Sequence, residues 1–118
     1  MTANLTLYEY KAELVRVVDG DTVDLAVDLG FRHRFTDRFR LYGINTPERG
    51  EKGWSAANEH LTSLLAYRGK PIGLRTHIDK RDKYGRWLAE LYVTLTDGTI
   101  LFVNQDMIDR GYAVRYMS

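Results

Sequence analysis

Three short segments of the chain combine acidic, basic and turn-forming residues. They are residues 18–22 (VDGDT), 40–48 (RLYGINTPE) and 82–86 (DKYGR). Carboxylates bind hard metal ions, and a planar guanidinium can donate two parallel hydrogen bonds to one phosphate. In-line attack of water on a phosphodiester needs a hard cation, cationic hydrogen-bond donors and a group that holds the water. The three segments together contain the residue types that this hydrolysis requires.

The distribution of charge is more informative than the net charge of +1. Residues 16–28 contain four acids and one arginine, whereas residues 32–52 contain six Lys or Arg against three acids, and residues 68–86 contain seven against two. A basic field that guides a polyanion onto a small acidic site would produce this pattern. Solvated faces of strands and loops would produce it too, and charge alone favours that simpler interpretation.

The elements that must position these residues are mainly strands. Residues 22–28 alternate apolar and polar side chains, which is the strand period. Residues 8–18 and 35–44 are rich in β-branched and aromatic residues, so a three-stranded meander is expected. Three more strand-like segments follow, at residues 72–78, 87–95 and 99–103. Between the last two, Asp97 and Gly98 predict a hairpin turn.

Two helices are expected. The first has apolar residues at helical spacing, with Ser55 as its N-cap and Gly69 placed to end it. A second, short helix has Asn104 as its N-cap and Gly111 at its stop.

These elements predict one α+β domain, mainly β, over residues 1–118. A small closed sheet is expected, because closure removes unpaired edges and is typical of OB-folds. The 44% hydrophobic and 28% charged residues are those of a globular protein. No signal peptide or transmembrane helix is visible, so the expectation is a cytoplasmic monomer without membrane contact. Cysteine is absent, and the three histidines show no metal-ligand spacing, so zinc is not expected.

The three segments, in this order and at these separations, resemble the staphylococcal nuclease (thermonuclease) family. The resemblance runs from about Tyr10 to Tyr116 and includes the order of strands and helices. It implies a five-stranded OB-fold barrel with two flanking helices. It also implies a Ca²⁺ cofactor, DNA and RNA as substrates, and products that end in a 3′-phosphate.

The expected metal ligands lie in the first two segments. Asp21 supplies a carboxylate for a hard cation. The resemblance adds the side chain of Asn45 and the main-chain carbonyl of Thr46. Asp19 is expected next to the metal or one contact removed from it, although it could equally hydrogen-bond its own turn. Asn45 is an amide where the best-known family pattern has an aspartate, so weaker calcium binding is expected.

The resemblance assigns catalytic roles to Arg40, Glu48 and Arg86. The two arginines match those that grip the scissile phosphate, and Glu48 matches the carboxylate that positions or deprotonates the attacking water. The alternatives are that Arg40 forms an ion pair with a nearby acid, and that Glu48 is an acid at a helix start. Three further residues are expected to bind substrate, namely Lys83, Tyr84 and Tyr116, although Lys83 and Tyr84 could equally be ordinary exposed turn residues.

A different class of function remains open, an OB-fold module that binds nucleic acid but has weak or no catalytic activity. A scaffold of this kind would be expected to lose the arginines or the glutamate first. Since Arg40, Glu48, Arg86 and Asp21 are all present, the sequence favours the enzyme.

Overall fold

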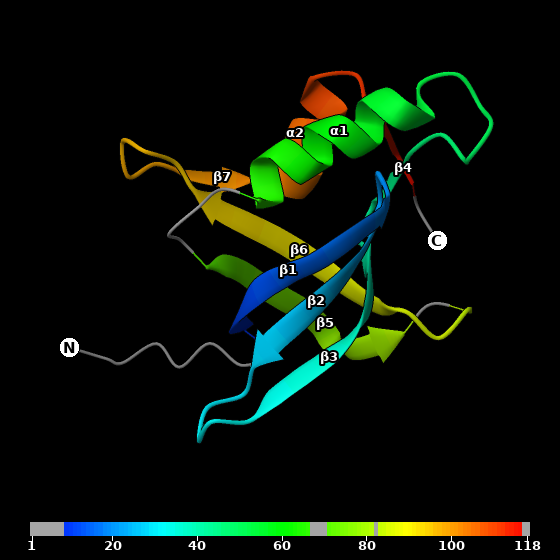
Figure 1. Ribbon diagram of the computed structural model, residues 1–118. Helices are drawn as coiled ribbons and strands as arrows, with labels where there is room; N and C mark the ends of the chain where they lie inside the picture. Colours follow the sequence, from blue (N-terminus) through cyan, green and yellow to red (C-terminus); the bar gives the residue numbers. More distant parts are fainter. Residues whose placement is uncertain (1–8, 67–70, 82, 117–118) are drawn as a thin grey trace.

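The computed structural model describes residues 9–66, 71–81 and 83–116 (Figure 1). It is mainly β with two helices, which confirms the predicted fold class. The predicted starting residue of the first strand, Tyr8, and the predicted end of the first helix, Gly69, lie outside the described residues. Neither helix of the described part is long and apolar enough to cross a bilayer.

Five strands close into a barrel. β1 (Glu9–Asp19), β2 (Thr22–Asp28) and β3 (Arg34–Leu41) form the predicted antiparallel meander, and β1 also pairs with β5 (Ile72–Arg81). β6 (Trp87–Thr94) pairs antiparallel with β5 and parallel with β3, which completes the ring. The predicted five-stranded barrel is therefore confirmed.

The barrel interior follows from the alternation of apolar residues. On β2, Val23, Leu25 and Val27 are at most 2% exposed. Ala89 and Leu91 of β6 face the same interior and are fully buried. Because successive side chains of a strand point to opposite faces, the residues between them are directed outward.

Three short strands extend the barrel. β7 (Ile100–Phe102) adds to the open edge of β6, and β4 (Ile44–Asn45) pairs with β8 (Val114–Arg115). The pairing of β4 with β8 is not predicted from the sequence. Each strand has two residues, which is too short for a periodic pattern to be recognised.

The first helix, α1 (Trp54–Leu65), packs across one end of the barrel (Figure 1). The prediction of Ser55 as N-cap is wrong, because the cap is Gly53 and Ser55 lies inside the helix. Gly53 has a φ of +95°, a conformation that glycine adopts without a steric penalty. The helix therefore begins before Ser55 is reached.

The second helix, α2 (Val103–Asp109), ends as predicted but begins differently. Gly111 has a φ of +81° and donates its N–H to the Ile108 carbonyl at 3.0 Å. The Tyr112 N–H donates to the Met107 carbonyl at 2.9 Å, and bonds of this kind are typical of a helix end. The prediction of Asn104 as N-cap is wrong, because Phe102 occupies that position.

Asn104 instead connects α2 to the barrel. Its side chain is 2% exposed and accepts a hydrogen bond from the Leu91 N–H at 3.0 Å. Its amide donates to the carbonyls of Tyr42 at 2.9 Å and Ala89 at 3.1 Å. Asn104 thus satisfies three main-chain groups, two on β6 and one in the turn after β3.

The hairpin between β2 and β3 projects away from the helices (Figure 1). Its turn is closed by a 2.8 Å hydrogen bond from the His33 N–H to the Gly30 carbonyl. The two central residues, Phe31 and Arg32, have φ values of +55° and +64°. A left-handed conformation disfavours a non-glycine residue by about 1–2 kcal/mol.

Candidate active site

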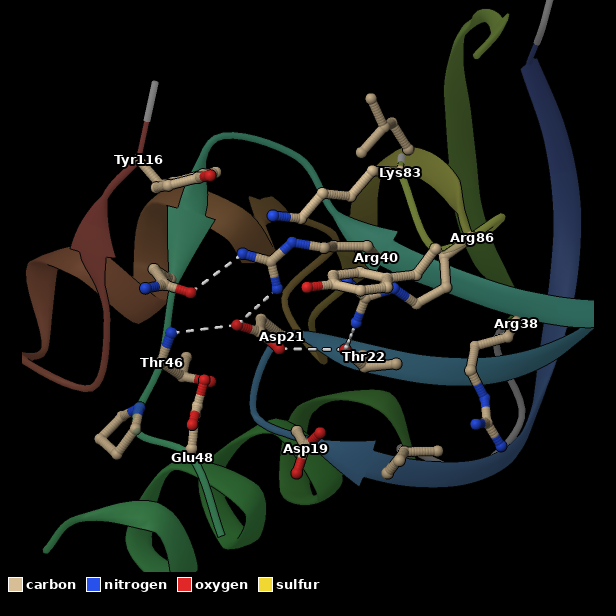
Figure 2. Close-up of a pocket in the computed structure, with 15 residues that line it drawn as sticks. Asp19, Asp21, Thr22, Arg38, Arg40, Thr46, Glu48, Lys83, Arg86 and Tyr116 are labelled. Carbon is tan, nitrogen blue, oxygen red and sulfur yellow. Dashed lines mark hydrogen bonds and ion pairs between the residues drawn. The ribbon is translucent and has the colours of Figure 1, made fainter. Parts of the chain in front are cut away.

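The chain has a pocket of about 860 Å³ on one face of the barrel (Figure 2). Every residue that the sequence nominated for a site lines it, although the residues come from distant parts of the chain. They are Asp19, Asp21, Arg40, Asn45, Thr46, Glu48, Lys83, Tyr84, Arg86 and Tyr116.

The topology explains why these residues meet. Thr22 lies opposite Arg40 in the β2–β3 register, so the turn after β1 is beside the end of β3. The parallel pairing of Arg40 with Leu88 brings the β5–β6 turn to the same place. Pairing of β4 with β8 adds Asn45 and the start of the C-terminal segment.

Asp21 is the buried acid of the pocket and is 6% exposed. Its Oδ1 accepts a hydrogen bond from the Thr22 hydroxyl at 3.0 Å, and its Oδ2 accepts one from the Thr46 N–H at 3.1 Å. Arg40 Nη1 lies 2.7 Å from the same Oδ2. The carboxylate is thus held in one orientation by three partners (Figure 2).

Arg40 lies between two oxygen donors of the predicted metal site. Besides its ion pair with Asp21, its Nη2 donates to Asn45 Oδ1 at 3.0 Å and to the Ile44 carbonyl at 2.9 Å. The Tyr116 ring lies 5.7 Å from the guanidinium carbon. The ion pair that the sequence left open for Arg40 is present, and its partner is the pocket acid.

Asp19 is fixed by α1 rather than by its own turn. Its Oδ1 accepts a 2.8 Å hydrogen bond from the indole N–H of Trp54, the first residue of the helix. The Arg49 guanidinium lies 4.8 Å from the Trp54 ring. No sequence pattern connects Trp54 with the site, because aromatic residues in small domains usually serve packing.

Glu48 lies on the exposed rim of the pocket, on the side of Asp21 and Thr46 (Figure 2). Its main-chain N–H donates to Glu51 Oε1 at 2.6 Å, and its carbonyl accepts the Glu51 N–H at 2.9 Å. These bonds form a tight turn after Pro47. The Glu48 carboxylate forms no hydrogen bond or ion pair with the residues that the structure describes.

The β5–β6 turn supplies the opposite wall. Arg86 Nη1 donates to the Thr22 hydroxyl at 3.2 Å, and its guanidinium carbon lies 5.2 Å from the Tyr84 ring. Lys83 Nζ lies 5.2 Å from the same ring, which is 70% exposed. Asp82, part of the third sequence segment, lies outside the described residues.

Sequence reasoning missed two polar residues of the pocket, Thr22 and Arg38. Thr22 is the hydroxyl that joins Asp21 to Arg86. Arg38 donates to both carboxylate oxygens of Asp24, at 2.8 and 3.1 Å, and this lowers the pKa of Asp24. The β2–β3 register, with Thr22 opposite Arg40 and Asp24 opposite Arg38, was the signal that could have found them.

Comparison with known proteins shows the family of the chain. A family model described as staphylococcal nuclease homologue matches residues 38–118. The chain belongs to the staphylococcal nuclease family. The match begins within β3, so the turn that carries Asp19 and Asp21 precedes it.

The chain is similar to known proteins over nearly its whole length. It is 31% identical to a micrococcal nuclease of Shigella flexneri, over 92% of this chain and 59% of that protein. It is 35% identical to an uncharacterized endonuclease of Escherichia coli O157:H7, over 87% of this chain and 59% of that protein. Protein ParB of Escherichia coli is 30% identical, over 92% and 58%. The chain thus spans about three fifths of the length of these relatives.

Proposed function

We propose that this chain is a metal-dependent nuclease that hydrolyses phosphodiester bonds of DNA, RNA or both by in-line attack of water. One observation carries the proposal. A single pocket contains a buried carboxylate, Asp21, two arginines, Arg40 and Arg86, and an uncommitted rim carboxylate, Glu48. Family membership and the names of the relatives support the same class of reaction.

The pocket residues fit a hard cation. Asp21 and Asn45 both direct an oxygen to the Arg40 guanidinium, so their oxygens already lie within reach of one positive group. The Thr46 hydroxyl oxygen is buried without a hydrogen-bond partner among the described residues. A buried polar atom of this kind normally has a partner.

Calcium suits this set of donors best. Among the described residues, no three His, Cys, Asp or Glu side chains gather around one point. The ion would therefore depend on neutral oxygens as well as on Asp21, with Asn45 and the Thr46 carbonyl as ligands and Asp19 beside them. Calcium accepts carboxylate, amide and main-chain oxygens in flexible geometry. When bound, it would stabilise the negative charge that develops on the phosphate.

The side chains of the pocket would divide the remaining work. Arg40 and Arg86 donate hydrogen bonds to the phosphate oxygens, for which the planar guanidinium is suited. To do so, Arg40 gives up part of its contact with Asp21 and Asn45. Glu48 holds or deprotonates the attacking water, because its carboxylate is exposed and close to this wall.

The rim of the pocket would select a nucleic-acid chain. Lys83 adds positive charge beside the exposed Tyr84 ring, and Tyr116 covers Arg40 from the other side. An aromatic ring next to a cation suits a nucleotide, because the base can stack on the ring while the phosphate binds the cation. We extend the proposal to products that end in a 3′-phosphate.

The alternative is an OB-fold module that binds nucleic acid with weak or no cleavage. Two observations favour it, the neutral amide at Asn45 and the ion pair by which Arg40 neutralises Asp21. Both weaken the attraction of the pocket for a cation. The two functions differ in whether the nucleic acid is cleaved when a divalent metal ion is present.

The decisive experiment measures cleavage of end-labelled single-stranded DNA with calcium, with magnesium and with excess chelator. Cleavage that needs a divalent ion is expected, and cleavage by clean protein in excess chelator would contradict the metal site. Binding without cleavage under all conditions would favour the alternative. The labelled ends also report whether the phosphate stays on the 3′ side.

Variants test the individual side chains. Arg40→Lys and Arg86→Lys should each lower turnover about 100-fold or more, as loss of one preorganised donor does. Glu48→Gln should bind substrate normally and lose most hydrolysis. Arg16→Lys is the matched control, because Arg16 is an exposed barrel arginine outside the pocket. Equal rates for all four variants would show that the pocket residues do not act on the phosphate.

A further inference from the structure

The tip of the β2–β3 hairpin presents an aromatic ring to solvent. Phe31 is 95% exposed, and the three residues that follow it, Arg32, His33 and Arg34, are exposed as well. A phenylalanine surrounded by basic residues matches the pairing of stacking surface and positive charge that binds single-stranded nucleic acid.

The backbone conformation at the tip is unfavourable for a phenylalanine, so local structure does not explain the presence of Phe31 there. A two-residue turn with positive φ at both central positions strongly favours Asn and Gly. Here the two positions are Phe31 and Arg32. Strain of this kind is often retained at sites of function. The turn therefore holds Phe31 in a strained conformation that buries almost none of it.

The outer face of β3 connects the tip to the pocket. Strand alternation places Arg34, Thr36, Arg38 and Arg40 on one face, whereas Phe39, between the last two, is 2% exposed on the other. Arg38 and Arg40 both line the pocket (Figure 2). The row of residues 34, 36, 38 and 40 is named the β3 track below.

Ion pairs reduce the charge of the β3 track without removing it. Arg38 is committed to Asp24 by two hydrogen bonds. Arg34 faces Glu13 at 3.4 Å, with both side chains more than half exposed, so a phosphate can compete for it. Arg32 forms no ion pair with any residue in the described ranges.

We propose that the hairpin tip is a second contact for single-stranded nucleic acid, in which an unpaired base stacks on Phe31 and phosphates bind Arg32 and Arg34. The strand then follows the β3 track into the pocket. The inference rests on the proposed function and names the substrate form, since only an unpaired base offers its face to a ring.

The geometry sets the length of nucleic acid that can use both contacts. Arg34 and Arg40 are six residues apart, or roughly 20 Å along an antiparallel strand. At the 3.4 Å spacing of stacked nucleotides this corresponds to about 6 nucleotides. An oligonucleotide of about 3 nucleotides can occupy the pocket alone, whereas one of about 12 reaches the tip.

The test is binding of fluorescent oligothymidines of these two lengths, measured by anisotropy in excess chelator so that no strand is cut. The parent should bind the longer strand more tightly. Phe31→Asn should weaken binding of the longer strand at least about 5-fold, the lower end of one base–aromatic stack, and leave the shorter strand unaffected. Phe31→Tyr should bind like the parent.

Controls separate recognition from folding. Asn suits the left-handed turn, so Phe31→Asn should melt at the same temperature as the parent or higher. Ile100→Asn is the matched control, because it removes another exposed apolar side chain, 67% exposed, on β7. It should bind both strands like the parent.

Several results would overturn the inference. One is equal binding of the longer strand by Phe31→Asn and the parent, and another is no binding of that strand by the parent. If Phe31→Asn weakened the binding of duplex DNA as much as that of single strands, stacking of an unpaired base on Phe31 would be refuted. If Phe31→Asn changes only the sedimentation of the protein without nucleic acid, the hairpin tip is a contact between copies of this chain, and the inference is overturned. Calcium-dependent cleavage of short substrates is measured separately, so the proposed function can stand or fail independently.

Discussion

Removal of the Asn104 side chain should destabilise the protein far more than its position in a seven-residue helix suggests. Asn104→Ala deletes three hydrogen bonds, to Leu91, Tyr42 and Ala89. The Ala89 carbonyl keeps a second partner, the Tyr42 N–H at 2.8 Å. The Leu91 N–H loses its side-chain acceptor in the interior, which alone disfavours the fold by about 1–3 kcal/mol. With about 1 kcal/mol for the remaining bonds, the loss is about 3 kcal/mol.

Chemical denaturation followed by fluorescence of the two tryptophans measures this loss. A loss of about 3 kcal/mol corresponds to a melting temperature lower by roughly 12 °C for a domain of this size. Gln105→Ala is the control, because Gln105 is the next residue of α2 and its partners, Asp109 and Arg115, are exposed. It should change stability by about 0.5 kcal/mol or less. Equal denaturation midpoints for the two variants would refute the role given to Asn104.

Three further predictions concern the pocket and its supports. Asn45→Asp should lower the calcium concentration needed for half-maximal cleavage, and an unchanged calcium titration would remove Asn45 from the ligand set. Asp24→Asn should be less stable than the parent at neutral pH. Because Arg38 lowers the pKa of Asp24 from 3.8, the difference should shrink as pH falls below that value, which acid titrations of both proteins can check. Gly20→Ala should destabilise the fold by about 1–3 kcal/mol in denaturant melts, because its Cβ would lie 2.8 Å from that of Ala57.

The sequence was sufficient to find ten residues of the pocket, but it missed Thr22 and Arg38 and did not predict the contacts between the side chains. Alternation of side chains on β2 and β3 fixes which residues face outward, and the DGDT and KYGR turns are set by local chemistry. The pairing of β3 with β6 depends on the twist and tilt of the whole barrel, so no local sequence pattern predicts it. The hydrogen bond from Trp54 to Asp19 joins residues 35 positions apart, so it too depends on the tertiary fold and is not predicted by a local pattern.

The two incorrect helix caps have a related cause. Ser55 and Asn104 are favourable N-cap residues by intrinsic preference, but each lies inside its helix. At α1, a left-handed Gly53 starts the helix earlier. At α2, the amide of Asn104 is used by main-chain groups of the barrel instead of by its own helix. Tertiary hydrogen bonding overrides local preference in the second case.

The pairing of β4 with β8 also determines when the pocket can exist during synthesis. Ile44 pairs with Arg115, and Tyr116 then donates its N–H to the Gly43 carbonyl at 2.8 Å. Segments so distant in the chain meet late, because closing a long loop precedes any gain from the contact. A nascent chain that has not yet released residues 114–116 from the ribosome lacks this wall of the pocket. The complete pocket therefore forms only after nearly all of these 118 residues are free to fold.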